Sequence, residues 1–146
     1  NSKARCRAYA GTSTPTPSWH SKKCVLPNWS LIHCEDDIDE GTPRGPKREH
    51  VVQLLEWAKQ LPDDAVVLVH CEAGVSRSTA AALAILVQHH GLDKLDDCIR
   101  LLLEVRPQAC PNPVITKYAD QLLGCDGRLH DAAEIIAKNK LFPFLK

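Results

Sequence analysis

Several features are missing from this chain of 146 residues, and each absence excludes a class of protein. No apolar run approaches the roughly 20 residues that a transmembrane helix needs, so we expect no membrane partner. Basic and acidic residues number 18 each, and this neutral balance gives no reason to expect nucleic acid or an anionic membrane as the main partner. Any positive field for an anionic substrate must therefore be local to one pocket.

Methionine is absent altogether and the chain begins at Asn1, so we expect that its natural start is missing. No signal peptide is visible, although a removed leader stays an open alternative. The length and the apolar content of 44% are those of one globular domain, which we expect to span residues 1–146. We expect this domain to be a monomer.

Cysteines are present, but they lack the pairing that metal sites and disulfide frameworks need. Their number is odd, and no two form a C-x-x-C pair. Free thiols suit a reducing compartment, so we expect a cytoplasmic protein without a metal site. Except for Cys71, we expect these residues to be small buried apolar side chains. The seven are Cys6, Cys24, Cys34, Cys71, Cys98, Cys110 and Cys125.

Hydrophobic periodicity predicts the order of the structural elements. The continuous apolar run at residues 65–69 is typical of a strand buried on both faces, as in a parallel sheet. Residues 78–90 are apolar nearly all round and predict a central buried helix that Gly91 ends. This succession predicts a three-layer α/β domain with a mostly parallel central sheet flanked by helices. The other expected elements are a strand at residues 29–34 and helices at residues 3–10, 47–61, 94–105, 114–123 and 131–138.

The segment between the buried strand and the buried helix carries the chemistry. It reads His70-Cys71-Glu72-Ala73-Gly74-Val75-Ser76-Arg77-Ser78. The backbone N–H groups of such a tight loop can converge on an anion, and the N-terminus of the following helix adds favourable potential. A glycine in the loop permits a backbone angle that a side chain disfavours. We therefore expect phosphate to be bound by Glu72, Ala73, Gly74, Val75, Ser76 and Arg77.

Cys71 and Arg77 have complementary expected roles in this loop. The planar guanidinium of Arg77 can bind two phosphate oxygens at once. The same positive field should lower the pKa of Cys71 and give a thiolate nucleophile. The hydroxyl of Ser78 can hydrogen-bond the sulfur and help it leave, and His70 is expected to orient the loop.

The pattern His-Cys-x-x-Gly-x-x-Arg-Ser resembles the signature loop of the cysteine-dependent protein tyrosine and dual-specificity phosphatases. The likeness runs from about Leu31 to Leu129. Together with the segment at residues 105–112, it looks like a compact bacterial group of predicted tyrosine phosphatases. It is weak before Pro27, where we expect the usual first strand to be absent or cut short. The resemblance implies the phosphatase fold.

The resemblance also implies a two-step reaction that needs no metal or cofactor. A thiolate forms a phosphocysteine while an aspartic acid on a separate loop protonates the leaving oxygen, and water then hydrolyses the intermediate. The acidic loop at residues 35–40 follows a strand, as the acid loop of the family does. We expect Asp37 to be this acid, because Asp37-Ile38 matches the bacterial group. Asp36 and Asp39 are the alternatives.

The expected substrate is a phosphorylated protein or peptide. The phosphate loop contains no lysine and carries Glu72, which argues against inositol lipids with several phosphates. Phosphotyrosine is the expected target, and hydrolysis of phosphoserine and phosphothreonine stays open because pocket depth depends on the surrounding loops.

Two other interpretations stay open. The first is a pseudophosphatase, which binds phosphate without turnover. The second is another thiol enzyme acting on an oxyanion, such as an arsenate reductase, with Cys34 or Cys110 as resolving cysteine. Outside the loop, we expect Asn112 to cap a helix. We expect Arg106 to form a surface ion pair, and a second contact with the anion is the alternative for this residue.

Overall fold

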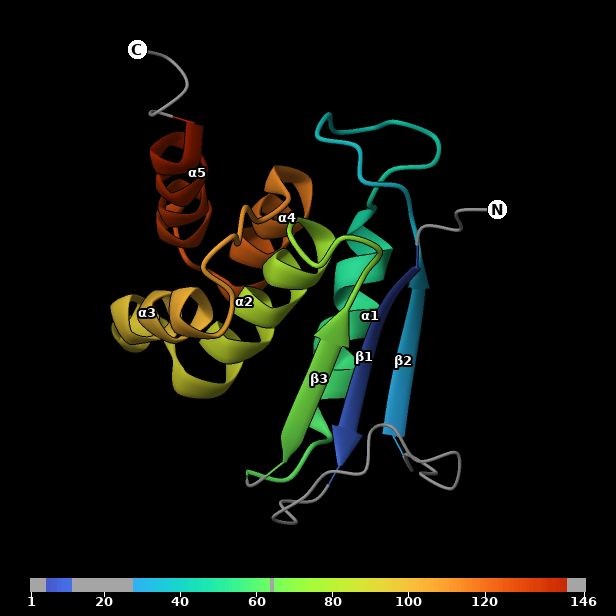
Figure 1. The fold of residues 1–146 in the computed structure, drawn as a ribbon. Helices are drawn as coiled ribbons and strands as arrows, with labels where there is room; N and C mark the ends of the chain where they lie inside the picture. The colour runs from blue at the N-terminus through green and yellow to red at the C-terminus, as the bar shows by residue number, and fades with distance from the viewer. Residues whose placement is uncertain (1–4, 12–27, 64, 142–146) are drawn as a thin grey trace.

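The computed structural model describes residues 5–11, 28–63 and 65–141, in which a sheet is packed against a group of helices (Figure 1). Its strands are β1 (Arg5–Gly11), β2 (Asn28–His33) and β3 (Val66–His70). Its α-helices are α1 (Arg48–Lys59), α2 (Arg77–His90), α3 (Leu95–Val105), α4 (Pro113–Leu123) and α5 (Arg128–Leu141), with a short 3-10 helix at Leu92–Lys94. The predicted strands at 29–34 and 65–69, and the predicted helices from 47 onward, all coincide with these elements.

The sheet has the order β2-β1-β3, and β1 pairs antiparallel with both neighbours. In register, Arg7 of β1 lies opposite His70 of β3. The expectation of a mostly parallel sheet is therefore wrong for the described strands, and so is the expected helix at residues 3–10, where β1 lies. Pairing on both edges satisfies the backbone N–H and C=O groups of β1, a gain that the local sequence does not reveal.

The described helices cover one face of this sheet. Ile32 of β2 and Val69 of β3 pack against Leu54 of α1 and Ala81 of α2. On the other face, the side chain of Leu68 is 41% exposed. The expectation that β3 is buried on both faces is thus wrong, and the described part of the chain forms two layers rather than three.

Helix α2 is the centre of the helical layer, as its apolar sequence predicts. It contacts α1, α3, α4 and β3 (Figure 1). Leu83 is fully buried on it, and Ala80 and Ala84 allow neighbouring helices to approach closely. The helix ends at Gly91, which has a φ of 93°, in the region that favours glycine. Because β3 ends at His70 and α2 begins at Arg77, this packing fixes the position of the loop between them.

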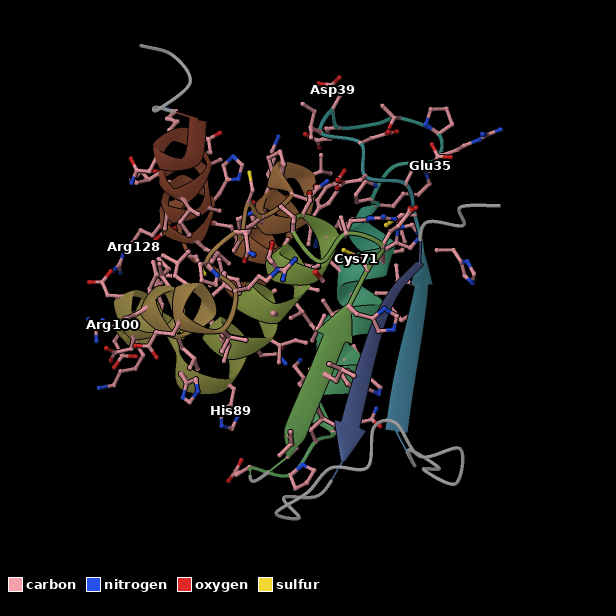
Figure 2. The ribbon with its side chains drawn as sticks, in the orientation of Figure 1. Glu35, Asp39, Cys71, His89, Arg100 and Arg128 are labelled. Carbon is pink, nitrogen blue, oxygen red and sulfur yellow. The ribbon has the colours of Figure 1, made fainter. Side chains whose placement is uncertain are left out.

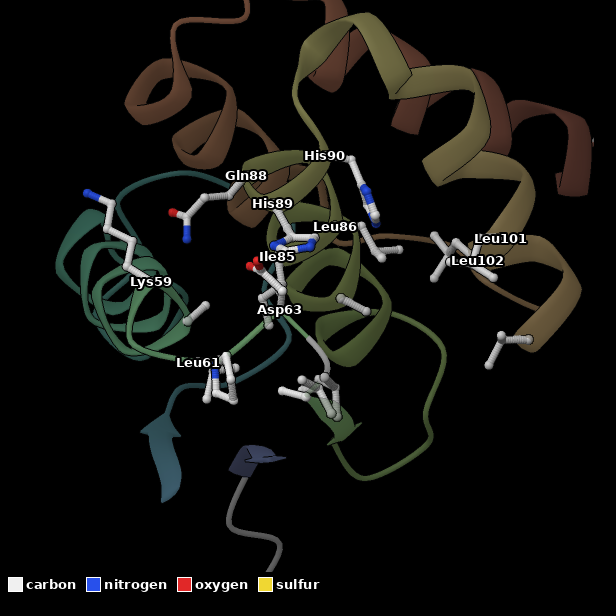
Figure 3. Close-up of a pocket in the computed structure, with 17 residues that line it drawn as sticks. Lys59, Leu61, Asp63, Ile85, Leu86, Gln88, His89, His90, Leu101 and Leu102 are labelled. Atoms are coloured by element: carbon white, nitrogen blue, oxygen red, sulfur yellow. The ribbon is translucent and has the colours of Figure 1, made fainter. Parts of the chain in front are cut away.

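A cavity of about 580 Å³ lies at the opposite end of α2 from this loop. It is lined mainly by apolar side chains, together with Lys59 and His89 (Figure 3). Figure 2 shows His89 and Cys71 at opposite ends of the helix. Among the described residues, no helix has both the length and the apolar character that crossing a membrane requires.

We predict that Leu83→Ala destabilises the domain by about 2–5 kcal/mol, because it removes buried methyl groups and leaves a cavity beside α2. Urea unfolding followed by circular dichroism measures this change. Ile135→Ala, at a side chain that is 58% exposed, is the control and should change the free energy of unfolding by less than about 1 kcal/mol. Equal losses in both variants would contradict the central position of α2.

Candidate active site

The loop from Cys71 to Ser76 joins the carboxyl end of β3 to the first turn of α2. The N–H of Ala80 donates to the carbonyl of Ser76 at 3.1 Å, as the first turn of the helix forms. The N–H groups before it have no partner within the helix, so they are available to an anion. Gly74 has a φ of 69°, which confirms that the loop requires glycine there.

The carbonyl groups of the loop are held on its outer side. The N–H of Cys110 donates to Val75 O at 2.9 Å, and the N–H of Asn112 donates to Ser76 O at 3.1 Å. The guanidinium of Arg106 donates to the carbonyls of Ala73 and Gly74. Because each peptide group is planar and trans, its N–H points away from its carbonyl. The following N–H groups therefore face the opposite side of the loop.

Arg77 is buried, with 5% of its surface exposed, and only part of its guanidinium is paired. Nη1 donates to the carbonyl of Cys34 at 2.7 Å. Nε is buried without a hydrogen-bond partner in the structure. A buried unpaired donor is costly and uncommon, so it points to a ligand that supplies the acceptor. A phosphate oxygen is such an acceptor.

Cys71 is half-buried, and its Sγ lies 3.3 Å from Oγ of Ser78. Burial alone raises the pKa of this thiol, because it penalises the charged form. The hydroxyl and N–H of Ser78, the N–H of Gly74 and the charge of Arg77 together outweigh burial, so the pKa of Cys71 is lowered. The arrangement favours a thiolate nucleophile and brings Ser78 to the sulfur.

The other predicted loop residues take simpler positions. Nδ1 of His70 lies 3.5 Å from the carbonyl of Cys71, at the outer limit of a hydrogen bond. Glu72 and Ala73 are exposed, so their contribution to an anion site comes from the backbone. Thr79 is an addition to the predicted set, because its hydroxyl donates to the carbonyls of Val75 and Ser76.

The acidic loop reaches the phosphate loop through Asp36. Its Oδ1 accepts a hydrogen bond from the hydroxyl of Ser76 at 2.6 Å and another from Nδ2 of Asn112 at 2.8 Å. Asp37 is held by its backbone, since its carbonyl accepts from Nδ2 of Asn112 at 3.0 Å. Asp39 lies at the outer part of the loop, away from Cys71 (Figure 2).

Helix α4 holds the outer part of this acidic loop. Lys117 forms an ion pair with Glu40, and the hydroxyl of Tyr118 donates to Glu40 at 3.4 Å. The hydrogen bond and charge of Lys117 lower the pKa of Glu40. At the base of the loop, the N–H of Glu35 donates to the carbonyl of Arg44 at 2.7 Å. These contacts fix the loop beside the phosphate loop.

Asn112 has a larger role than the helix cap that the sequence predicts. The cap is confirmed, because Oδ1 accepts from the N–H groups of Val114 and Ile115. The same side chain is fully buried, and its Nδ2 holds Asp36 and Asp37. A cap signal alone could not reveal this second contact, which joins residues far apart in the chain.

Comparison with known proteins agrees with this geometry. The family model described as "Dual specificity phosphatase, catalytic domain" matches residues 32–123, which is well over half of the chain. The chain belongs to this family. The match includes the acidic loop, the phosphate loop and the segment that ends at Asn112. Membership gives this dual specificity phosphatase domain an α/β phosphatase fold.

Curated relatives match a shorter part of the domain. It is 37% identical over 78 residues to dual specificity protein phosphatase Mpk3 of Drosophila melanogaster, over 53% of this chain and 18% of the relative. It is 44% identical over 61 residues to dual specificity protein phosphatase 19 of Mus musculus, over 42% of this chain and 26% of the relative. The matched region thus spans about a quarter or less of these relatives, which give no support to the bacterial grouping. No solved structure matches the chain significantly.

The structure is also informative about metal ligands and free thiols. Within the described ranges, no group of three or more His, Cys, Asp or Glu side chains is placed to hold a metal ion. Cys34, Cys98 and Cys125 are buried free thiols, which confirms their expected role as small buried residues. The side chains of Cys6 and Cys24 lie outside the described part of the structure.

We predict that Cys71 is alkylated by iodoacetamide at lower pH than Cys98, because its pKa is lowered whereas burial raises the pKa of Cys98. Ser78→Ala removes one hydrogen bond to the thiolate, so it should shift the alkylation profile of Cys71 to higher pH. Mass spectrometry of each cysteine-containing peptide across a pH series measures both effects. An unchanged profile in Ser78→Ala would show that the hydroxyl does not stabilise the thiolate.

Proposed function

We propose that this domain hydrolyses phosphate monoesters on protein side chains through a phosphocysteine intermediate. The observation that carries the proposal is the buried guanidinium of Arg77, which has an unpaired Nε and begins α2 directly after the loop that holds the activated thiol of Cys71. One group binds an oxyanion and the other attacks its central atom. Family membership supports the same chemistry.

In the first step, the thiolate of Cys71 attacks phosphorus, so that an S–P bond forms and the P–O bond to the leaving group breaks. Charge develops on the equatorial oxygens, where Arg77 and the loop N–H groups stabilise it. A carboxylic acid gives its proton to the leaving oxygen. The product of this step is phosphocysteine and a free hydroxyl side chain.

In the second step, water attacks phosphorus and the S–P bond breaks. The carboxylate left by the first step accepts a proton from the water. The hydroxyl of Ser78, 3.3 Å from the sulfur, hydrogen-bonds the departing thiolate and makes it a better leaving group. Inorganic phosphate then leaves and the enzyme returns to its starting state.

We assign the acid to Asp36, with Asp37 as the alternative that the sequence favours. Asp36 contacts the phosphate loop directly through Ser76, and both of its hydrogen bonds fall on Oδ1. Oδ2 is therefore left to carry the proton. The side chain of Asp37 lies against Gly45, where an added Cβ would come within 3.2 Å of its Oδ2. This position points it toward the turn at residues 42–45.

The substrate class follows from the family and from the rim of the loop. The relatives are named dual specificity protein phosphatases, which supports phosphotyrosine together with phosphoserine or phosphothreonine in proteins. Glu72 is exposed on the loop, and its negative charge disfavours ligands with several phosphates. A singly phosphorylated protein side chain fits these features.

The buried environment of Cys34 argues against this residue as the resolving cysteine of the arsenate-reductase alternative. Such an enzyme needs a second thiol that attacks as a thiolate. Burial raises the pKa of Cys34 to about 11, despite the opposing charge of Arg77. At neutral pH this thiol is almost wholly protonated, so it is a poor resolving cysteine.

Hydrolysis of para-nitrophenyl phosphate in the presence of a chelator tests the proposal. We expect metal-independent turnover by the chain and loss of at least about a thousandfold in Cys71→Ser, which removes the nucleophile. Binding of tungstate by both proteins serves as the control for folding of the loop. A folded, reduced chain that binds tungstate without turnover would instead be the pseudophosphatase.

The acid is identified with Asp36→Asn, Asp37→Asn and Asp39→Asn on phenyl phosphate, whose leaving group needs protonation. Loss of the acid should lower kcat about 100-fold or more and abolish the fall of kcat at high pH, because that fall reports the acid losing its proton. We expect this result for Asp36→Asn, and near-normal kcat for Asp39→Asn. The same pair of effects in Asp37→Asn alone would transfer the assignment to Asp37.

A further inference from the structure

The anion site depends on four consecutive carbonyl groups that point away from it, those of residues 73–76. A carbonyl turned outward brings the next N–H inward, because the peptide group is planar. A carbonyl without a partner would be free to turn back, and a peptide flip would then replace an N–H donor by a repulsive oxygen. The partners of these four carbonyls therefore control the binding site.

One side chain supplies the partners for half of this set. Nε of Arg106 donates to Gly74 O at 2.8 Å, and Nη2 donates to Ala73 O at 3.1 Å. The guanidinium lies close against Gly74, since an added Cβ there would be 3.4 Å from Nη2. The other two carbonyls receive backbone N–H groups of Cys110 and Asn112.

The backbone of Arg106 is itself fixed at both ends. Its N–H donates to the carbonyl of Leu102 at 2.8 Å, and its carbonyl accepts from the N–H of Ala109 at 3.0 Å. The side chain of Arg106 therefore extends from a backbone that is held in place at the end of α3. The contacts of this side chain with the loop carbonyls differ from both roles expected from the sequence, a surface ion pair and a second anion contact.

We propose that Arg106 is a positioning residue, which turns the peptide groups after Ala73 and Gly74 so that their N–H groups face the bound oxyanion. The planar fork of arginine places two donors at a fixed separation, matching two successive carbonyls. A lysine carries the same charge but lacks this fork. The role in catalysis rests on the proposed phosphatase function, whereas the role in anion binding does not.

The test compares Arg106→Lys, Arg106→Met and Arg100→Met with the unaltered chain. Arg100 lies on α3 with an exposed side chain that pairs with Asp97 at 3.0 Å, so Arg100→Met controls for the loss of one positive charge. Titration calorimetry with tungstate gives Kd, and iodoacetamide alkylation against pH reports on the thiol of Cys71. Thermal unfolding shows which variants are folded.

We expect both Arg106 variants to raise the Kd for tungstate about tenfold. A change of this size corresponds to the loss of roughly one charge-assisted hydrogen bond. The alkylation profile of Cys71 should move to higher pH in both, because the N–H of Gly74 helps to stabilise its thiolate. Arg100→Met should match the unaltered chain. If Arg106→Lys keeps the original Kd and profile, charge alone is sufficient and the positioning role is wrong.

Two further outcomes keep the test decisive. If Arg106→Met does not fold, Arg106→Lys alone decides between charge and geometry. If the unaltered chain binds tungstate but does not turn over substrate, the phosphatase proposal fails while the comparison of Kd values still tests Arg106.

An equal rise of Kd in Arg100→Met and Arg106→Met would overturn the proposal that Arg106 is a positioning residue, since it would show a general effect of charge.

Discussion

The outward orientation of the carbonyls at residues 73–76 is the constraint on which the rest of the site depends. Convergent N–H groups repel one another, so the loop keeps this shape only if its carbonyls are satisfied elsewhere. The connection between α3 and α4 does this through Arg106, Cys110 and Asn112. This connection therefore supports the proposed anion site, although it contributes nothing that must touch phosphate.

Asn112 extends the same arrangement to the acidic loop. Its Oδ1 caps α4, its Nδ2 holds Asp36 and its N–H holds the carbonyl of Ser76. One buried residue thus joins three segments through its side chain and its backbone, and movement of any one of them would leave buried polar groups unpaired. At the same site, Nε of Arg77 has no hydrogen-bond partner in the structure. The protein tolerates an unsatisfied group at the point where a ligand can satisfy it.

The phosphate loop could be predicted because its chemistry lies in nine consecutive residues between a strand and a helix. The helices from residue 47 onward were also predictable, since their apolar spacing is local. β1 was not, because its stability comes from pairing with two distant strands. The choice between Asp36 and Asp37 likewise depends on Ser76 and Asn112, which lie far along the chain. Arg106 directly follows α3, and this position in the sequence does not indicate that its side chain contacts the carbonyls of Ala73 and Gly74.

The contrast between Cys71 and Cys34 shows what makes one thiol reactive. Burial raises the pKa of both, and the charge of Arg77 lowers the pKa of both. Burial weighs more on Cys34, which is buried, than on Cys71, which is half-buried, and it is the main reason why the pKa of Cys34 rises to about 11. The pKa of Cys71 falls because Ser78 and Gly74 give hydrogen bonds to its sulfur, whereas at Cys34 the nearby acidic groups, Asp36 foremost, add to the effect of burial. Proximity to arginine is therefore insufficient, and reactivity is localised by the donors that the loop geometry directs at one sulfur.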